Sequence, residues 1–446
     1  MQGRSLAAKL DRHHSLWDVA VLLLNYWRAR PPSHIPPPQH FDERVRDRWA
    51  DLKRDVEDVF RGRVHGKLTD EDRRMIATWV KGEDLDAIHA VASGIDEEAW
   101  VTFFSSWRDN LPLLDDQRYA MRPSDLYPVS GRVWGSGTPL AVSSPPSDDE
   151  LAHIRIHHPH AAQTRKLVFD FSFEEQLEPI FDSLATLATV HPNVDVRDFR
   201  RNTRQSPFPI RVADEKRQLE CFRRLLSVVE RTAAQVVVSP EHAATDGVLE
   251  AAQAWLDASD APRLLVPGTI HEGDRSTASN VAYGLVPGRS ERLTHRKLIP
   301  LAHERRSRPL RETLAPVVEI VVYAANRFRI ALLVCKDLLP RGGSSIRTAL
   351  VDAGVNVVLI PSMSEQTEPF TLAIPSLVEA GAVVVFANGP LRWTPPASAI
   401  AVYGQPYAAH PMVVVKPTAS RTARPGVSLL RIGQSSAKWR SLRRRA

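Results

Sequence analysis

V-V-V-S-P-E-H at residues 236–242 and A-L-L-V-C-K-D at residues 331–337 are the two stretches that decide the fold of this chain. In each, a continuous apolar run, typical of a buried parallel strand, stops at a residue with reactive chemistry. Pro240 cannot donate to a strand ladder, so Glu241 is expected just beyond the carboxyl end of the first strand. Cys335 follows the second strand in the same way. Because ligand chemistry collects at the carboxyl ends of strands in open α/β folds, both side chains are predicted on one rim of one sheet.

A third string, H-R-K-L-I-P at residues 295–300, adds a cation at Lys297. A thiol that attacks a carbonyl or nitrile carbon needs a base, a positive charge for the developing anion, and a proton for the leaving amine. A carboxylate, an ammonium and a cysteine are sufficient for this chemistry. The three strings together therefore indicate a site for nucleophilic catalysis by a thiol.

The chain from about residue 165 to 432 resembles the nitrilase, or carbon–nitrogen hydrolase, superfamily. That family carries hydrophobic-Pro-Glu, Arg-Lys-hydrophobic and Cys-x-Asp strings, which here are Pro240-Glu241, Arg296-Lys297-Leu298 and Cys335-Lys336-Asp337. Two later family features are matched by V-V-L-I-P-S-M-S at 357–364 and V-E-A-G-A-V-V-V-F-A-N-G at 378–389. The chain departs from the family at Lys336, where an aromatic residue is usual, and this affects the expected substrate more than the expected reaction.

The resemblance implies an α/β fold, a four-layer α-β-β-α nitrilase-like sandwich. The helical pattern of the preceding residues predicts a mostly helical N-terminal domain, which the resemblance does not cover. The resemblance also implies an amidase-like hydrolase of carbon–nitrogen bonds other than peptide bonds, working through a Glu-Lys-Cys triad and a covalent thioester. In that scheme Cys335 is the nucleophile and Glu241 is the base. Lys297 and the backbone N–H of Lys336 hold the oxyanion.

Further site residues follow from the same resemblance. Glu304 matches by position a second glutamate that many family members carry, and Glu312 is held in reserve. Asp337 is expected to order the loop beneath the cysteine, while Ser362 and Asn388 are expected to support the pocket. The substrate class is a small amide, carbamoyl compound or nitrile, and the acyl acceptor stays open between water and another nucleophile. No cofactor and no metal are expected.

A second function class stays open beside the enzyme. In it, the nitrilase-like domain is an interaction, scaffold or regulatory component of a larger assembly, for example in bacterial defence, and the N-terminal domain recruits partners. Nitrilase-like domains usually pair, so a homodimer or larger oligomer is expected through helices at 344–353 and 370–380. The apolar stripe proposed for this contact consists of Ala349, Leu350, Ala353, Leu372, Ala373 and Leu377.

The sequence predicts four regions: a helical domain of unknown role, a Pro/Gly/Ser-rich linker or arm, a nitrilase-like domain and a basic C-terminal tail, at 1–122, 123–160, 161–432 and 433–446. In the first region, helical patterns cover 5–28, 41–61, 69–80, 85–93 and 97–110. In the third, strands alternate with helices expected at 174–189, 213–231, 246–258, 344–353 and 370–380.

Composition narrows the setting. The chain has 446 residues and only two cysteines, Cys221 and Cys335, which favours a reducing compartment over a disulfide framework. The histidines of I-H-H-P-H at 156–160 lack ligand spacing. No apolar run is long enough to span a membrane, so the cytoplasm is the expected location. The net charge is +6, and nucleic acid is a less favoured partner for the basic tail.

Overall fold

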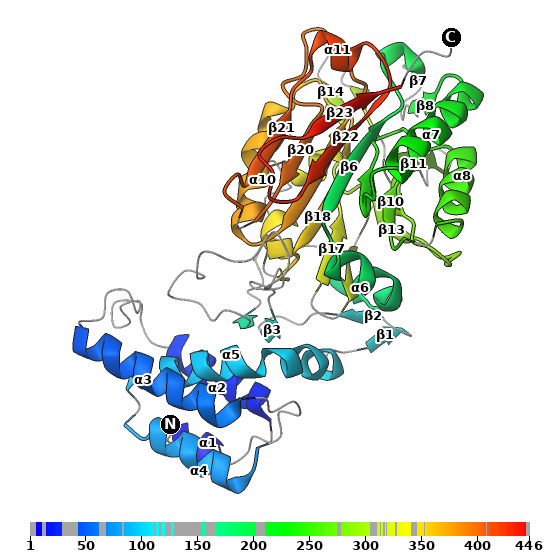
Figure 1. Ribbon diagram of the computed structural model, residues 1–446. Helices are drawn as coiled ribbons and strands as arrows, with labels where there is room; N and C mark the ends of the chain where they lie inside the picture. The colour runs from blue at the N-terminus through cyan, green and yellow to red at the C-terminus, as the bar shows by residue number, and fades with distance from the viewer. Residues whose placement is uncertain are drawn as a thin grey trace. The chain divides into compact units, whose positions relative to one another are not determined.

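The computed structural model (Figure 1) describes residues 6–10, 15–28, 43–61, 68–82, 84–110, 113–115, 118–120, 126–128, 154–156, 166–201, 210–259, 261–273, 278–303, 310–312, 314, 317, 319–325, 328–339, 346–351, 353–406 and 408–442. The chain folds as two units. The helical unit takes in residues 1–112, 122–133 and 142–158, and the sandwich unit takes in residues 113–121, 134–141 and 159–446.

The helical unit is built from α1 (Leu6–Leu10), α2 (Leu16–Arg28), α3 (Glu43–Phe60), α4 (Asp70–Trp79), α5 (Leu85–Asn110) and the hairpin of β3 (Leu126–Pro128) and β4 (Ile154–Ile156). Helix α4 begins where Thr69 and Asp72 form a reciprocal capping box. Helix α5 is continuous, whereas the sequence predicted two helices on either side of Gly94. That glycine lies against α3, where an added Cβ would come within 2.7 Å of Val56, so it serves close helix packing and does not end the helix.

One face of the sandwich unit is a mixed sheet of nine strands. Their order is β1 (Leu113–Asp115), β2 (Arg118–Ala120), β5 (Lys166–Asp170), β16 (Glu319–Ala325), β17 (Phe328–Leu332), β18 (Val357–Ser362), β19 (Val383–Asn388), β20 (Ala401–Gly404) and β21 (Met412–Val415). Strands β17, β18 and β19 are parallel to one another. All three are buried along their length, which explains their continuous apolar sequences.

The second face is a sheet of five strands, in the order β10 (Leu264–Val266), β9 (Val236–Val238), β6 (Thr186–His191), β22 (Gly426–Arg431) and β23 (Lys438–Ser441). Strands β6, β9 and β10 are parallel, and β22 runs antiparallel to β6. The two sheets pack on each other. The Tyr403 hydroxyl from β20 crosses the interface and donates to the Ser428 carbonyl oxygen on β22 at 2.9 Å.

Helices cover the outer face of each sheet. Helices α6 (Glu174–Asp182) and α10 (Glu368–Glu379) pack on the nine-stranded sheet, and α7 (Glu215–Glu230) and α8 (Asp246–Asp257) pack on the five-stranded sheet (Figure 1). The four-layer α-β-β-α sandwich expected from the sequence is confirmed.

Smaller elements lie beside the sandwich. A three-stranded sheet comprises β11 (Thr269–Glu272), β12 (Ser279–Gly284) and β13 (Leu293–Arg296). Two hairpins pair β7 (Phe199–Arg201) with β8 (Ile210–Val212) and β14 (Ala302–His303) with β15 (Leu310–Arg311). Residues 346–351 are helical, α11 spans Ala419–Thr422, and 3-10 turns span Val196–Asp198 and Cys335–Leu338.

Three further sequence expectations differ from the structure. The helix expected over 174–189 ends at Asp182, and Thr186–His191 forms β6, because the β-branched run T-L-A-T-V fits the middle of a sheet. Residues 438–441, expected in a tail, form β23, an edge strand paired with β22. Residues 113–115 and 118–120, expected in the helical domain, form β1 and β2, the first two strands of the nine-stranded sheet, with β1 at its edge.

The apolar stripe expected at a dimer contact is mostly core. Ala349, Leu350, Ala353, Ala373 and Leu377 are buried within the chain, and only Leu372, which is 74% exposed, faces outward. Their apolar character is therefore explained by packing inside the sandwich unit. Pairing of two chains stays a prediction, which light scattering tests. None of the helices in the described part of the chain has the length and apolar character needed to cross a bilayer.

Candidate active site

Glu241 lies in a tight loop that follows β9. The preceding Pro240 is seated between two glycines: an added Cβ would come within 2.4 Å of the Pro240 carbonyl oxygen at Gly268 and within 2.8 Å of the Pro240 ring at Gly389. Glycine is thus required on both sides of the loop. The chain then turns through His242, whose φ is +61°. This combination directs the buried Glu241 side chain inward.

Cys335 begins the 3-10 turn after β17 and is 4% exposed. Its φ is +49°, in the left-handed region that costs a residue with a Cβ about 1–3 kcal/mol and is common at active sites. The buried carboxylate of Asp337 holds this turn in place, since it accepts hydrogen bonds within 3.0 Å from the backbone N–H groups of Val334, Leu298 and Ile299 and lies 2.9 Å from His295 Nε2. Asp337 thereby ties the cysteine turn to the segment that carries Lys297.

The expectation that Glu241 and Cys335 share one sheet is wrong. Glu241 follows a strand of the five-stranded sheet, and Cys335 follows a strand of the nine-stranded sheet. The two sheets pack face to face, and the Glu241 loop meets the end of β18: the Glu241 N–H donates to the Ser362 carbonyl oxygen at 3.3 Å. The Met363 N–H in turn donates to Glu241 Oε2 at 3.1 Å. Strand ends from two facing sheets therefore create the site.

Lys297 comes from the three-stranded sheet. It directly follows β13, and its N–H donates to the Asn280 carbonyl oxygen on β12 at 2.8 Å. Asn280 is paired in register with His271 on β11, so the three polar residues form a row across this sheet. The Lys297 ammonium lies 2.8 Å from Glu241 Oε1 and 2.8 Å from Glu312 Oε2. One buried cation therefore bridges two buried carboxylates.

Glu312 fills the place of a second glutamate beside Lys297. Its Oε2 also accepts the Leu301 N–H at 2.9 Å, and its Oε1 lies 3.0 Å from His271 Nε2. The Asn280 amide donates to both carboxylates, at 2.8 Å to Glu241 Oε1 and 3.2 Å to Glu312 Oε1. The expected second glutamate, Glu304, lies outside the described residues, and the reserve residue Glu312 is the one seen in the cluster.

The charges of the cluster set the protonation of its members. Burial raises the pKa of the Cys335 thiol to about 12; the Glu241 charge adds to this and the Lys297 charge opposes it. Burial acts to lower the pKa of Lys297, but the two glutamates outweigh it and hold that pKa well above its usual value. Burial acts to raise the pKa of Glu312, but Lys297 and His271 hold that pKa well below its usual range. The cluster thus keeps a charged ammonium beside a protonated thiol.

The remaining expected residues lie around these charges. Ser362, buried at the end of β18, meets the Glu241 loop through its carbonyl oxygen, which accepts the Glu241 N–H at 3.3 Å. Asn388, at the end of β19, accepts the Ser364 N–H at 2.8 Å and donates to the Ser364 carbonyl oxygen at 2.9 Å, which fixes the loop after β18. Lys336 follows the cysteine inside the 3-10 turn, so a backbone N–H is available there whatever its side chain.

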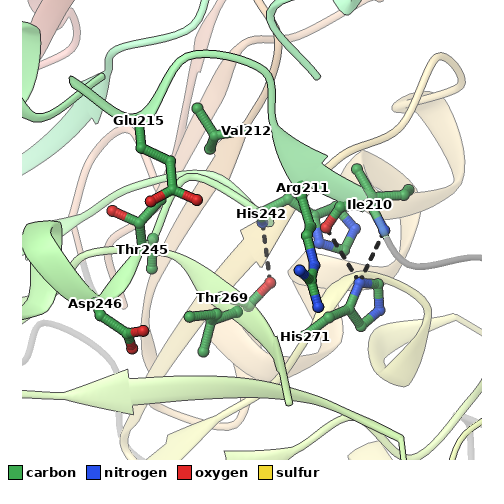
Figure 2. A pocket seen from close by; sticks show the side chains of 11 residues that line it. Ile210, Arg211, Val212, Glu215, His242, Thr245, Asp246, Thr269 and His271 are labelled. Carbon is green, nitrogen blue, oxygen red and sulfur yellow. Dashed lines mark hydrogen bonds between the residues drawn. The ribbon is translucent and has the colours of Figure 1, made fainter. Parts of the chain in front are cut away.

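A pocket of about 170 Å³ adjoins the glutamate side of the cluster (Figure 2). Its walls come from β8, the loop after Glu241, the start of α8 and β11. His242 and His271 line it with their rings 4.8 Å apart. No group of three or more His, Cys, Asp or Glu side chains in the described ranges is arranged to hold a metal ion.

Sequence reasoning missed Asn280 and His271. Each is a polar residue inside a short strand, and neither stands next to a motif. The only signal was their place in apolar surroundings, in V-P-G-T-I-H-E and S-N-V-A-Y-G, where a buried polar side chain needs a partner.

No protein-family model and no curated protein matches the chain. Among solved structures, the chain is similar to an amidase from Nesterenkonia sp., at 16% identity over 56% of this chain and 91% of the amidase, with a TM-score of 0.39. It is also similar to Saccharomyces cerevisiae Nit3, described as a member of branch 10 of the nitrilase superfamily, at 14% identity over 50% of this chain and 83% of Nit3, with a TM-score of 0.37. These similarities concern the fold of part of the chain, and we draw no inference about activity from them.

Proposed function

We propose that the sandwich unit is a hydrolase of carbon–nitrogen bonds that acts on a small amide, carbamoyl compound or nitrile through Cys335. The observation that supports this most directly is the Lys297 ammonium, held between two buried carboxylates on a segment that Asp337 ties to the Cys335 turn. A purely structural ion pair needs no thiol in a left-handed turn beside it. A nucleophile, a base and a fixed cation are the groups that acyl transfer to a thiol requires.

In the first half-reaction, Glu241 takes the thiol proton while sulfur attacks the substrate carbon. A carbon–sulfur bond forms, and for an amide the electron pair of the carbonyl moves to oxygen. Glu241 then gives its proton to the amine nitrogen as the carbon–nitrogen bond breaks. For an amide, the products of this step are a thioester on Cys335 and a free amine or ammonia. A nitrile instead gives a thioimidate with the proton on its nitrogen, and ammonia leaves only after water has added to that carbon.

In the second half-reaction, Glu241 takes a proton from water while the water oxygen attacks the thioester carbon. The carbon–sulfur bond breaks, and the proton returns to sulfur as the carboxylic acid leaves. No external oxidant, reductant or cofactor enters this balance. Each use of Glu241 requires a carboxylate fixed in place, which its contacts with Asn280 and the Met363 N–H provide.

The anion that develops on the substrate is stabilised by Lys297 and by the Lys336 N–H. Removal of one donor from such an arrangement typically slows catalysis by about 10²–10³-fold. Burial raises the pKa of the Cys335 thiol, so the attack by sulfur requires a base, and we assign that role to Glu241.

Intact-mass spectrometry after incubation with a mixed panel of amides and nitriles tests the proposal. We expect a mass increase equal to one acyl group on the wild-type chain and on Cys221→Ala. Cys221 lies on α7, where it packs against the core under the five-stranded sheet and its thiol lies 3.6 Å from the Pro192 carbonyl oxygen. The adduct should be absent from Cys335→Ala, which removes the nucleophile and little core volume. An adduct that persists in Cys335→Ala would contradict the mechanism, and a folded protein with no adduct from any panel member would favour a scaffold role.

A further inference from the structure

His271 holds Glu312 from the side opposite Lys297. Its Nε2 lies 3.0 Å from Glu312 Oε1, while the Lys297 ammonium and the Leu301 N–H both contact Oε2. The side chains of His271 and Glu312 are 8% and 5% exposed. Both oxygens of the Glu312 carboxylate therefore have hydrogen-bond partners in a buried environment. A small rotation of this carboxylate would change its distance to the Lys297 ammonium.

The backbone of β8 selects the form of the His271 ring. The Ile210 N–H points to His271 Nδ1 at 3.0 Å, and an N–H group can only donate, so Nδ1 carries the lone pair (Figure 2). The proton of the neutral ring then sits on Nε2, facing the Glu312 carboxylate. The opposite tautomer would place a lone pair against that anion and would leave a longer contact of 3.3 Å to the Ile210 carbonyl oxygen.

The far side of the ring opens to the pocket of about 170 Å³. Figure 2 shows His271 beside His242 and Thr269, with Arg211 reaching over them. His242 lies on the Glu241 side of the pocket: its Nε2 is 3.6 Å from Glu241 Oε1, and its backbone N–H donates to Thr269 Oγ1 at 2.9 Å. His271 is the ring that contacts Glu312.

We propose that His271 is a positioning residue: its Nε2–H holds Glu312 so that Glu312 keeps the Lys297 ammonium directed at the oxyanion. This proposal rests on the proposed function of the same cluster. The ring of His271 contacts Ile210, Glu312 and His242, so its effect on the reaction passes through Glu312 and Lys297. Misplacement of a catalytic group by about 1 Å can cost about 10²-fold in rate, so loss of this donor should be visible in acylation.

The pocket makes the proposal testable by chemical rescue. In His271→Ala, removal of the ring extends an existing pocket up to the Glu312 carboxylate. Added imidazole has the size, the donor and the acceptor of the lost ring, and it has a route from solvent. In His271→Phe the space stays filled, and imidazole has no place to bind. In His271→Gln the side chain keeps a donor for Glu312.

The experiment measures acylation of Cys335 by a panel substrate and alkylation of the same thiol by iodoacetamide, in full-length Cys221→Ala chains. We expect His271→Ala and His271→Phe to acylate at least about 10-fold more slowly. Imidazole should restore most of the rate in His271→Ala and none in His271→Phe, and His271→Gln should stay within a few-fold of the parent. Glu215→Gln, a change in the pocket wall away from the glutamates, should leave the rate unchanged with or without imidazole.

The two readouts separate this proposal from the proposed function. Normal acylation in His271→Ala would overturn the positioning role and leave the hydrolase proposal standing. Slow acylation that neither imidazole nor glutamine restores would also overturn it, since a role in stability alone gives that pattern. If no chain is acylated, the hydrolase proposal fails. An imidazole-dependent rate of alkylation in His271→Ala would still support the positioning role, and a rate equal to the parent's would reject it.

Discussion

Replacement of Lys297 by methionine removes the cation between two buried carboxylates and keeps most of the side-chain stem. The ammonium lies 2.8 Å from both Glu241 and Glu312 and is almost completely buried. Two effects should follow. The first is structural, because two neighbouring carboxylates lose their shared partner. The second is chemical, because the oxyanion loses its charge partner.

The sizes of the two effects differ enough to be measured together. Removal of one member of a buried ion pair typically costs about 3–5 kcal/mol of stability. Loss of an oxyanion partner should slow acylation by at least about 10²-fold. Substitution of Glu312 by glutamine in the Lys297→Met background removes one negative charge and returns the cluster to its original net charge. It keeps an amide of the same shape near His271 and Asn280.

We therefore expect Lys297→Met to unfold at lower urea concentration and to acylate slowly. Lys297→Met/Glu312→Gln should regain at least half of the lost stability and none of the acylation rate. The single Glu312→Gln variant completes the double-mutant cycle. Urea unfolding and single-turnover acylation are measured on the wild type, the two single variants and the double variant, and they separate the structural effect of Lys297 from its catalytic effect. Recovery of acylation in step with stability would refute the reasoning, because Lys297 would then act only by holding the fold.

Three further predictions concern the frame of the site. Gly389→Ala should lower the melting temperature and slow acylation, because the added Cβ would meet Pro240 at 2.8 Å and displace Glu241. A lower melting temperature with normal acylation would contradict the idea that this loop positions Glu241. Asp337→Asn should lower the free energy of unfolding in urea by about 1–3 kcal/mol. The asparagine NH2 group would then face backbone N–H groups from which the carboxylate now accepts hydrogen bonds. Burial lowers the pKa of His191 to about 3, so the unfolded chain binds a proton first as pH falls below about 6.5. The free energy of unfolding should therefore fall as the pH is lowered from about 6.5. Between about pH 6.5 and 4, His191→Gln should lose up to about 3 kcal/mol less of it than the wild type, because the histidine contributes about 1.4 kcal/mol per pH unit. Equal losses in both proteins would reject this explanation.

Local sequence was enough to identify Glu241, Lys297 and Cys335 as candidates, because each follows a strand end whose flanking residues are distinctive. It was not enough to assign the strands that precede Glu241 and Cys335 to separate sheets. Buried parallel strands have the same apolar sequence in either sheet, and only tertiary packing separates them.

The choice between Glu304 and Glu312 was beyond local sequence for a related reason. Both stand in one long connection, and only the contact of Glu312 with Lys297 and His271 identifies it as part of the cluster. His271 and Asn280 became visible only through the register of β11 and β12, which aligns them in one row with Lys297. Register between strands that lack a motif is set by the whole domain.

The three reactive groups come from three separate sheets: Glu241 from the five-stranded sheet, Cys335 from the nine-stranded sheet and Lys297 from the three-stranded sheet. No continuous piece of the chain that lacks one of these sheets holds the full set. Acylation of the cysteine should consequently report whether the three sheets are packed together. It should be lost when any one sheet separates from the others, even while the helices and strands themselves remain formed. Measurement of acylation and of circular dichroism along the same urea series would show whether the sheets separate before the secondary structure is lost.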